Sequence, residues 1–162
     1  MKNEIKNTFI ENHKLTYDLI ETLGDRELEI KWERPGLDTF KKHFQELISV
    51  QDAFTHAINK SEMSFDAVPD VFEFHDNISK NEIVELMKRA DQNLYNTIDA
   101  ADENIKIDWY GMEISLYTHI ANLIQHEVFH QGMMVMTLYK YRINIPDTWI
   151  ENWSLPQVND YK

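Results

Sequence analysis

Residues 114–142, ISLYTHIANLIQHEVFHQGMMVMTLYKYR, decide the fold, because this stretch is long, contains few charges and has no internal breaker other than one glycine. Apolar side chains would occur on nearly every side of a helix built from it, which predicts a helix at the centre of a bundle. Pro146 follows its expected end, as is common after a helix stops. Any polar group on such a central helix therefore requires an explanation.

Three further amphipathic helices are expected upstream of this stretch. The spacing of apolar residues predicts them over residues 2–23, 38–59 and 79–101. Gly24 is a plausible stop for the first helix, and Ser79 with Glu82 has the pattern of a capping box at the start of the third. Four such helices predict an all-α protein, a four-helix bundle formed by a single domain over residues 1–162.

The remaining segments are expected to connect or cover these helices. Residues 60–77 contain Pro69 and mixed polarity, and they are predicted to form a loop. Residues 105–113 have the composition of a short extended piece. Trp149 and Trp153 lie in the tail, and their large rings are expected to pack on the body of the protein or on a partner.

Charge and composition exclude several classes of function. The net charge is -12, with 28 acidic and 16 basic residues, which argues against a nucleic-acid partner and against docking on an anionic membrane. The chain has no cysteine, so disulfides, cysteine-ligated zinc and a thiol nucleophile are excluded. No apolar run is long enough to span a bilayer, and residues 1–12 have no apolar signal core. A cytoplasmic location is the resulting expectation.

Two histidines on the central helix carry the main functional hypothesis. His126 and His130 are four residues apart, so a helix places them on one face, where both imidazoles can converge on one divalent metal ion. The alternative is that both are partly buried histidines that only hydrogen-bond to neighbours. We favour metal binding, because a pair at this spacing on an otherwise apolar helix needs a common cause.

A third ligand has to come from another helix. His43 falls at the core-facing edge of the second helix and is predicted to complete the site, whereas His56 falls on the polar face. An ordinary boundary histidine is the alternative for His43. His119 lies about 10 Å along the axis from His126, at 1.5 Å per residue, and is expected to line a pocket or to pack. His13 is a reserve candidate, and no chemistry is predicted for a seventh histidine in the loop.

Three imidazoles would leave a coordination position open, which favours catalysis over a purely structural role. A water or thiol at such a position is acidified, and zinc is the expected metal, with nickel, cobalt and iron as alternatives that also accept imidazole.

The same segment, His126-Glu127-Val128-Phe129-His130, also matches the H-E-x-x-H pattern of zinc metallopeptidases. In that interpretation Glu127 is the general base and the only catalytic candidate. The pattern is short, and no third histidine follows it. The alternative for Glu127 is a surface residue at the polar edge of the helix.

The segment 126–132 resembles the signature of the DinB-like (YfiT-type) metalloproteins, in which two histidines four apart are commonly followed by Arg-Gly-Gln. Gln131 replaces that arginine and Met133 the glutamine, while Gly132 is kept. Trp32 and Pro35, which precede His43-Phe44, match an earlier mark of the family.

The resemblance implies a four-helix bundle with a triad of His43, His126 and His130, and a homodimer. It also implies a metal-dependent thiol S-transferase that uses a low-molecular-weight thiol such as bacillithiol, or a hydrolase, acting on a small-molecule substrate. Two other functions stay open at this point. One is the metallopeptidase with Glu127, and the other is a non-enzymatic, metal-stabilised binding protein.

Overall fold

A computed structural model describes residues 2–67 and 73–160 of the chain. Its elements are α1 (Lys2–Thr22), α2 (Asp25–Leu28), α3 (Phe40–Lys60), the 3-10 helix η1 (Phe65–Ala67), α4 (Lys80–Ala100), β1 (Lys106–Trp109), β2 (Met112–Ser115), α5 (Leu116–Tyr141) and α6 (Asp147–Trp153). The four long helices expected from the sequence are present, and short elements join them. Part of the predicted loop, residues 68–72 with Pro69, lies outside the described residues.

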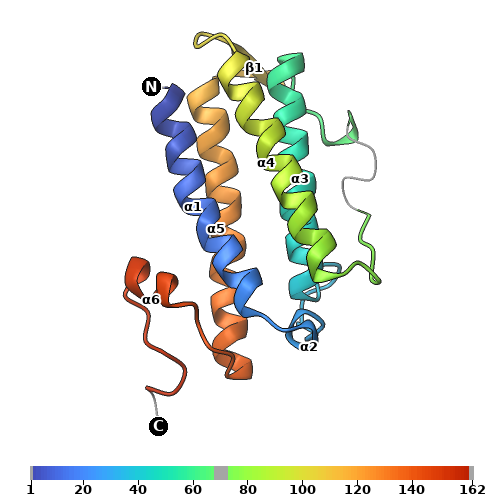
Figure 1. Ribbon diagram of the computed structural model, residues 1–162. Helices are drawn as coiled ribbons and strands as arrows, with labels where there is room; N and C mark the ends of the chain where they lie inside the picture. The colour runs from blue at the N-terminus through green and yellow to red at the C-terminus, as the bar shows by residue number, and fades with distance from the viewer. Residues whose placement is uncertain (1, 68–72, 161–162) are drawn as a thin grey trace.

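The four long helices lie side by side as a bundle (Figure 1). Going round the bundle, α1 packs on α4, α4 on α3, α3 on α5, and α5 on α1. Helices α1 and α5 run in one direction, and α3 and α4 run in the other, as the colours of Figure 1 show. Helix α5 is therefore antiparallel to its neighbour α3, and these are the two helices that carry the candidate metal ligands. The predicted central position of α5 was wrong: it is one of four helices round the bundle, and its apolar side chains Phe129 and Met136 are 62% and 69% exposed.

Helix ends follow local side-chain chemistry. Ser79 accepts a hydrogen bond from the backbone N–H of Glu82, whose carboxylate binds the Ser79 N–H in return, so the predicted capping box is confirmed. Thr39 caps α3 in the same way, through the N–H of Lys42. These side chains satisfy backbone donors that have no partner within the helix.

The core consists of two clusters of buried apolar side chains along the bundle. Trp149 of α6 is completely buried in one of them, and its indole N–H donates to the carbonyl oxygen of Leu15 at 2.7 Å. Trp153 packs against Trp149, with ring centroids 5.0 Å apart. The tail therefore packs back on the body of the protein, which was one of its two predicted positions.

A short hairpin stands where an extended piece was expected, so the described chain is mostly helical rather than all-α. Strands β1 and β2 pair antiparallel, with Ile107 opposite Ile114. Tyr110 and Gly111 form the turn with positive φ angles of 53° and 92°, which is the twist that a two-residue hairpin needs. Helix α5 consequently begins at Leu116, two residues later than predicted. No described helix is long and apolar enough to cross a membrane.

Candidate metal centre

Helix α5 presents His126 and His130 to α3. The two Nε2 atoms are 3.2 Å apart, as the four-residue spacing predicted. His130 is buried, whereas 27% of the His126 side chain is exposed. The pair therefore lies inside the bundle with one edge open to solvent.

Glu46 of α3 meets both histidines. Its Oε1 lies 3.3 Å from His126 Nε2, and its Oε2 lies 3.0 Å from His130 Nε2. These three residues are the one group of metal-ligand type found among the described residues. Two ligand atoms bound tetrahedrally at about 2.0–2.1 Å from zinc are roughly 3.3–3.4 Å apart. The two Nε2 atoms match this spacing, and one ligand atom from each of the three residues lies within 4.8 Å of the others, although the contacts of Glu46 to the two histidines come from different carboxylate oxygens.

The charges within this cluster also suit a cation. Burial by itself raises the pKa of Glu46, but the adjacent imidazoles of His126 and His130 outweigh it and hold the pKa at about 2. The buried Oε2 atom lies close to His130 without a well-directed hydrogen bond to it. An ionised, incompletely satisfied carboxylate facing two imidazole nitrogens is a donor set that divalent metals accept.

His43, the predicted third ligand, lies next to the cluster and contacts His130. Its Nδ1 is 2.8 Å from His130 Nδ1, and its Nε2 is 3.1 Å from the carbonyl oxygen of Leu37. A carbonyl only accepts, so His43 Nε2 carries the proton, and His43 Nδ1 accepts from His130 Nδ1. His130 Nε2 is then the nitrogen that faces Glu46, and a metal ion would take the place of any proton on it.

Burial lowers the pKa of His43 to about 3, and the charges of His130 and Arg34 act in the same direction. The neutral form needed for this arrangement is therefore the stable one. His43 has the position of a residue that orients His130, and Glu46 is the residue of α3 that meets the two Nε2 atoms. Metal binding by His43 itself stays a prediction.

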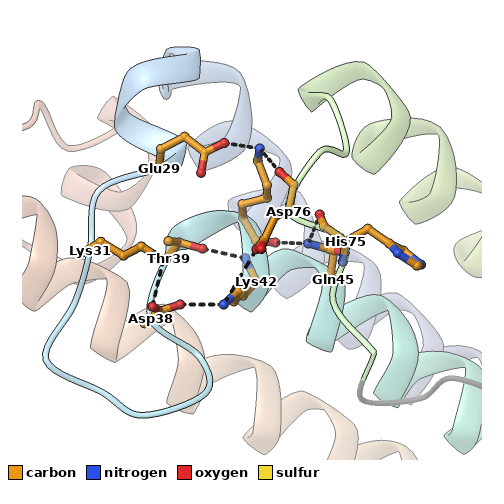
Figure 2. Close-up of polar contacts among 9 residues, drawn as sticks. Glu29, Lys31, Asp38, Thr39, Lys42, Gln45, His75 and Asp76 are labelled. Atoms are coloured by element: carbon orange, nitrogen blue, oxygen red, sulfur yellow. Dashed lines mark hydrogen bonds and ion pairs between the residues drawn. The ribbon is translucent and has the colours of Figure 1, made fainter.

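The loop between α2 and α3 packs on His43. The Trp32 ring packs on His43, with centroids 4.1 Å apart. Figure 2 shows how the loop is fastened: Asp38 pairs with Lys31 at 2.8 Å and with Lys42 at 2.9 Å. In the same view the backbone N–H of His75 donates to Gln45 Oε1 at 2.7 Å, which ties the chain before α4 to α3.

Glu127 faces α1 and is buried, so it is not the surface residue considered as one alternative. Its Oε1 accepts from His13 Nδ1 at 2.6 Å and from the Thr16 hydroxyl, and its Oε2 accepts from Asn12 at 3.1 Å. These bonds hold the carboxylate against α1, whereas Glu46 is on α3. The metallopeptidase interpretation thereby loses its general base.

His13, the reserve ligand, has a structural position in this second polar group. It lies between Glu127 and Asp91, whose Oδ1 is 3.2 Å from His13 Nε2. Burial opposes the charged form, but the charge of Glu127 and hydrogen bonds with both carboxylates outweigh it and raise the pKa of His13 to about 10. His13 is thus a buried cation that neutralises two acids.

The other histidines have separate environments. His119 is buried. It accepts a hydrogen bond from the Trp109 indole N–H at 2.9 Å and donates one to the carbonyl oxygen of Phe54 at 2.9 Å. Of its two expected roles, lining a pocket or packing, it therefore has the packing role. His56 is half-buried on the outer side of α3. The His75 side chain is exposed in the loop before α4.

Sequence reasoning missed Glu46, although a usable signal was present. Glu46 is one turn beyond His43 on a helix whose neighbouring positions are apolar, so a buried carboxylate could have been expected beside that histidine.

A scan against models of protein families finds no match to the chain, and a search of curated proteins finds no relative. The structure therefore shows a mostly helical protein with a buried Glu/His/His cluster.

Proposed function

We propose that this protein binds one divalent metal ion through Glu46, His126 and His130, with zinc as the expected metal and nickel as the alternative. The observation that carries the proposal is that one ligand atom from each of the three side chains lies within 4.8 Å of the others, with the two Nε2 atoms 3.2 Å apart, which is close enough for one ion. Three ligands leave a position open, and the exposed edge of His126 is where a small molecule can approach.

We further propose an enzyme of the kind that the family resemblance implies, a thiol S-transferase or a hydrolase acting on a small molecule. An ion bound here would supply Lewis-acid chemistry, lowering the pKa of a thiol or water. Glu46 contributes the negative charge, His43 fixes the tautomer of His130, and the loop that carries Trp32 shields the buried side of the cluster from water.

Metal content tests the proposal directly. Elemental analysis of untagged protein should find near-stoichiometric metal in the wild type and in His56→Ala, a control histidine on the same helix. Glu46→Gln keeps the shape of the side chain but removes its charge, and it should lose most of the metal. His43→Ala should weaken metal binding about 10- to 100-fold, as expected for a residue that supports a ligand.

X-ray absorption of the zinc-loaded wild type distinguishes this cluster from the triad implied by the family resemblance. Two imidazoles with oxygen ligands support Glu46, His126 and His130. Three imidazoles would place His43 in the coordination sphere, and metal retention in Glu46→Gln would agree with that result. Failure of the wild type to bind zinc, nickel or cobalt would refute the proposed function.

The non-enzymatic alternative was motivated by the two tail tryptophans as a surface for a partner. Because Trp149 is completely buried in the core and Trp153 packs on it, this motivation is weaker. The alternative predicts that metal removal lowers the thermal midpoint and that no thiol or hydrolytic substrate is turned over. Metal-dependent turnover would decide for the enzyme.

A further inference from the structure

Helices α3 and α4 form a polar groove that is separate from the candidate metal centre. The two helices lie side by side and run in the same direction (Figure 1). The groove between them has a volume of about 360 Å³, within the size range of small-molecule sites. Its walls are Asp52, Thr55, His56 and Asn59 from α3, and Asn93, Asn96 and Thr97 from α4. None of these residues belongs to the Glu46–His126–His130 cluster.

The walls of the groove consist of residues that helices do not favour. All seven are Asp, Asn, Thr or His, which rank low in helix propensity, and none is a strong helix former such as Ala, Lys, Gln or Glu. Strong helix formers occupy exposed positions of α4 that do not line the groove, for example Glu85 and Lys88. Departures from local helix preference commonly mark functional sites. Helix stability therefore does not explain the composition of the groove.

Short side chains also keep the groove open. Asp, Asn and Thr reach only a short way from the backbone, whereas the long side chains of Lys or Glu would extend across the space between two adjacent helices. Long side chains also lose more rotamer freedom when a ligand fixes them. The groove is therefore better prepared to receive a ligand than the charged surface of the rest of the protein.

A half-buried carboxylate in the wall has no partner. Asp52 makes no hydrogen bond or ion pair with a described residue, and the side chains of His56 and Asn93 likewise make none. Burial raises the pKa of Asp52, and the charge of Arg89 acts in the opposite direction. Leaving a half-buried acceptor without a donor is unfavourable, so a ligand that donates to Asp52 would be favoured.

The other amides of the groove also have unused groups. Asn59 donates through its amide nitrogen to the carbonyl oxygen of Thr55 at 3.3 Å, which leaves its side-chain oxygen available. Asn96 accepts through its side-chain oxygen from Gln92 at 2.8 Å, which leaves its amide hydrogens available. The groove therefore offers both donors and acceptors within a short distance.

The charge of the groove indicates the class of ligand. Asp52 is the one acidic residue in its walls, and Arg89 lies with Asp52 in the continuation of the groove towards the start of α4, so the two charges offset each other. The protein as a whole has a net charge of -12. No aromatic ring other than the imidazole of His56 lines the groove. A hydroxyl group both donates and accepts, so adjacent hydroxyls on an uncharged molecule match these walls.

We propose that the groove between α3 and α4 binds a neutral polyhydroxylated molecule, a sugar or a cyclitol. Asp52 accepts hydrogen bonds from adjacent hydroxyls, and Asn93 both donates and accepts. This inference is independent of the proposed function, because no metal ion takes part in it.

NMR titration of the isotope-labelled full-length protein tests the inference. The probes are D-glucose, D-galactose, D-mannose and myo-inositol, and putrescine serves as a cationic control. At least one of the four polyols should cause saturable shifts of backbone amides within residues 52–59 and 93–97, with a millimolar dissociation constant. Local shifts are the readout because sugars at high concentration stabilise proteins in general by exclusion from the surface.

Two variants connect the binding to named side chains. Asn93→Ala should weaken binding about tenfold, the loss expected for one or two hydrogen bonds. The same variant should unfold at a higher urea concentration than the wild type, because Ala is the better helix former. Asp52→Asn keeps the shape of the side chain without its charge and should also weaken binding. Lys88→Ala, on α4 outside the groove, should bind as the wild type does.

Each contrary result overturns a defined part of the proposal. No saturable shift with any of the four polyols, or shifts outside these two segments, overturns the site. Saturation by putrescine and by none of the polyols overturns the ligand class. Unchanged binding in both folded variants, or lower stability of Asn93→Ala, overturns the roles of these side chains. The metal content of the protein does not affect these outcomes, so they are distinct from a failure of the proposed function.

Discussion

The buried cation His13 makes the stability of the fold depend on pH in a range where few side chains titrate. Its pKa is raised from 6.5 to about 10 by Glu127 and Asp91, against the opposing effect of burial. The folded state therefore holds a proton that the unfolded chain releases near neutral pH. This contribution to stability is fully present below about pH 6.5 and is lost as the pH rises towards 10.

The magnitude follows from proton linkage. Between pH 7.5 and 9.5 the folded protein binds about one proton more than the unfolded chain, so stability should fall by about 1.4 kcal/mol for each pH unit. The total is about 3 kcal/mol, a large part of the 5–15 kcal/mol that is typical of a domain. Tyr17 and Tyr95, which lie near this group, have raised pKa values and titrate above the range.

The assay is urea unfolding of chelator-treated protein at several pH values from 7.5 to 9.5. His13→Gln should be less stable at pH 7.5 and should lose the slope, because the proton is no longer bound. His56→Gln, a half-buried histidine outside this group, should keep the slope. Wild-type stability that is flat across this range would refute the charge assigned to His13.

Three further predictions concern stability and assembly. Ser79→Ala removes the N-cap of α4 and should cost about 1 kcal/mol in urea unfolding, so an unchanged midpoint would contradict the capping box. Trp149→Ala empties a completely buried site and breaks the bond to Leu15, and it should cost about 3–5 kcal/mol; a loss below 1 kcal/mol would show that the tail is not docked in solution. The homodimer implied by the family resemblance stays a prediction, and we expect its interface on the exposed apolar face of α5, where Met136 is 69% exposed. Met136→Glu should shift the sedimentation coefficient to that of a monomer, and an unchanged coefficient would exclude this face as the interface.

The long helices could be predicted because their signals are local. Apolar spacing located α1, α3, α4 and α5, and Ser79 with Glu82 located the start of α4. The direction in which each helix runs and the order of the helices round the bundle could not be read in the same way. Both depend on which apolar faces pack together, and many pairings of such faces have similar patterns.

The candidate site was predictable to the extent that one helix determines it. His126 and His130 converge because four residues make about one turn, whereas the partner from α3 depends on how that helix is rotated. Both His43 and Glu46 lie on the buried side of α3, and only the packing against α5 decides that the carboxylate faces the two Nε2 atoms. Glu127 is the opposite case, because its short sequence motif suggested a catalytic role that its packing does not support. In the structure it packs against α1 and pairs with His13.

The two sides of the candidate metal site are far apart in the chain. Glu46 and His126 are separated by 80 residues, with all of α4 and the hairpin between them. Closing so long a loop costs chain entropy, which favours late formation of these contacts during folding. We therefore expect an ion to bind only after the bundle is assembled, so that it slows unfolding and leaves the rate of refolding unchanged.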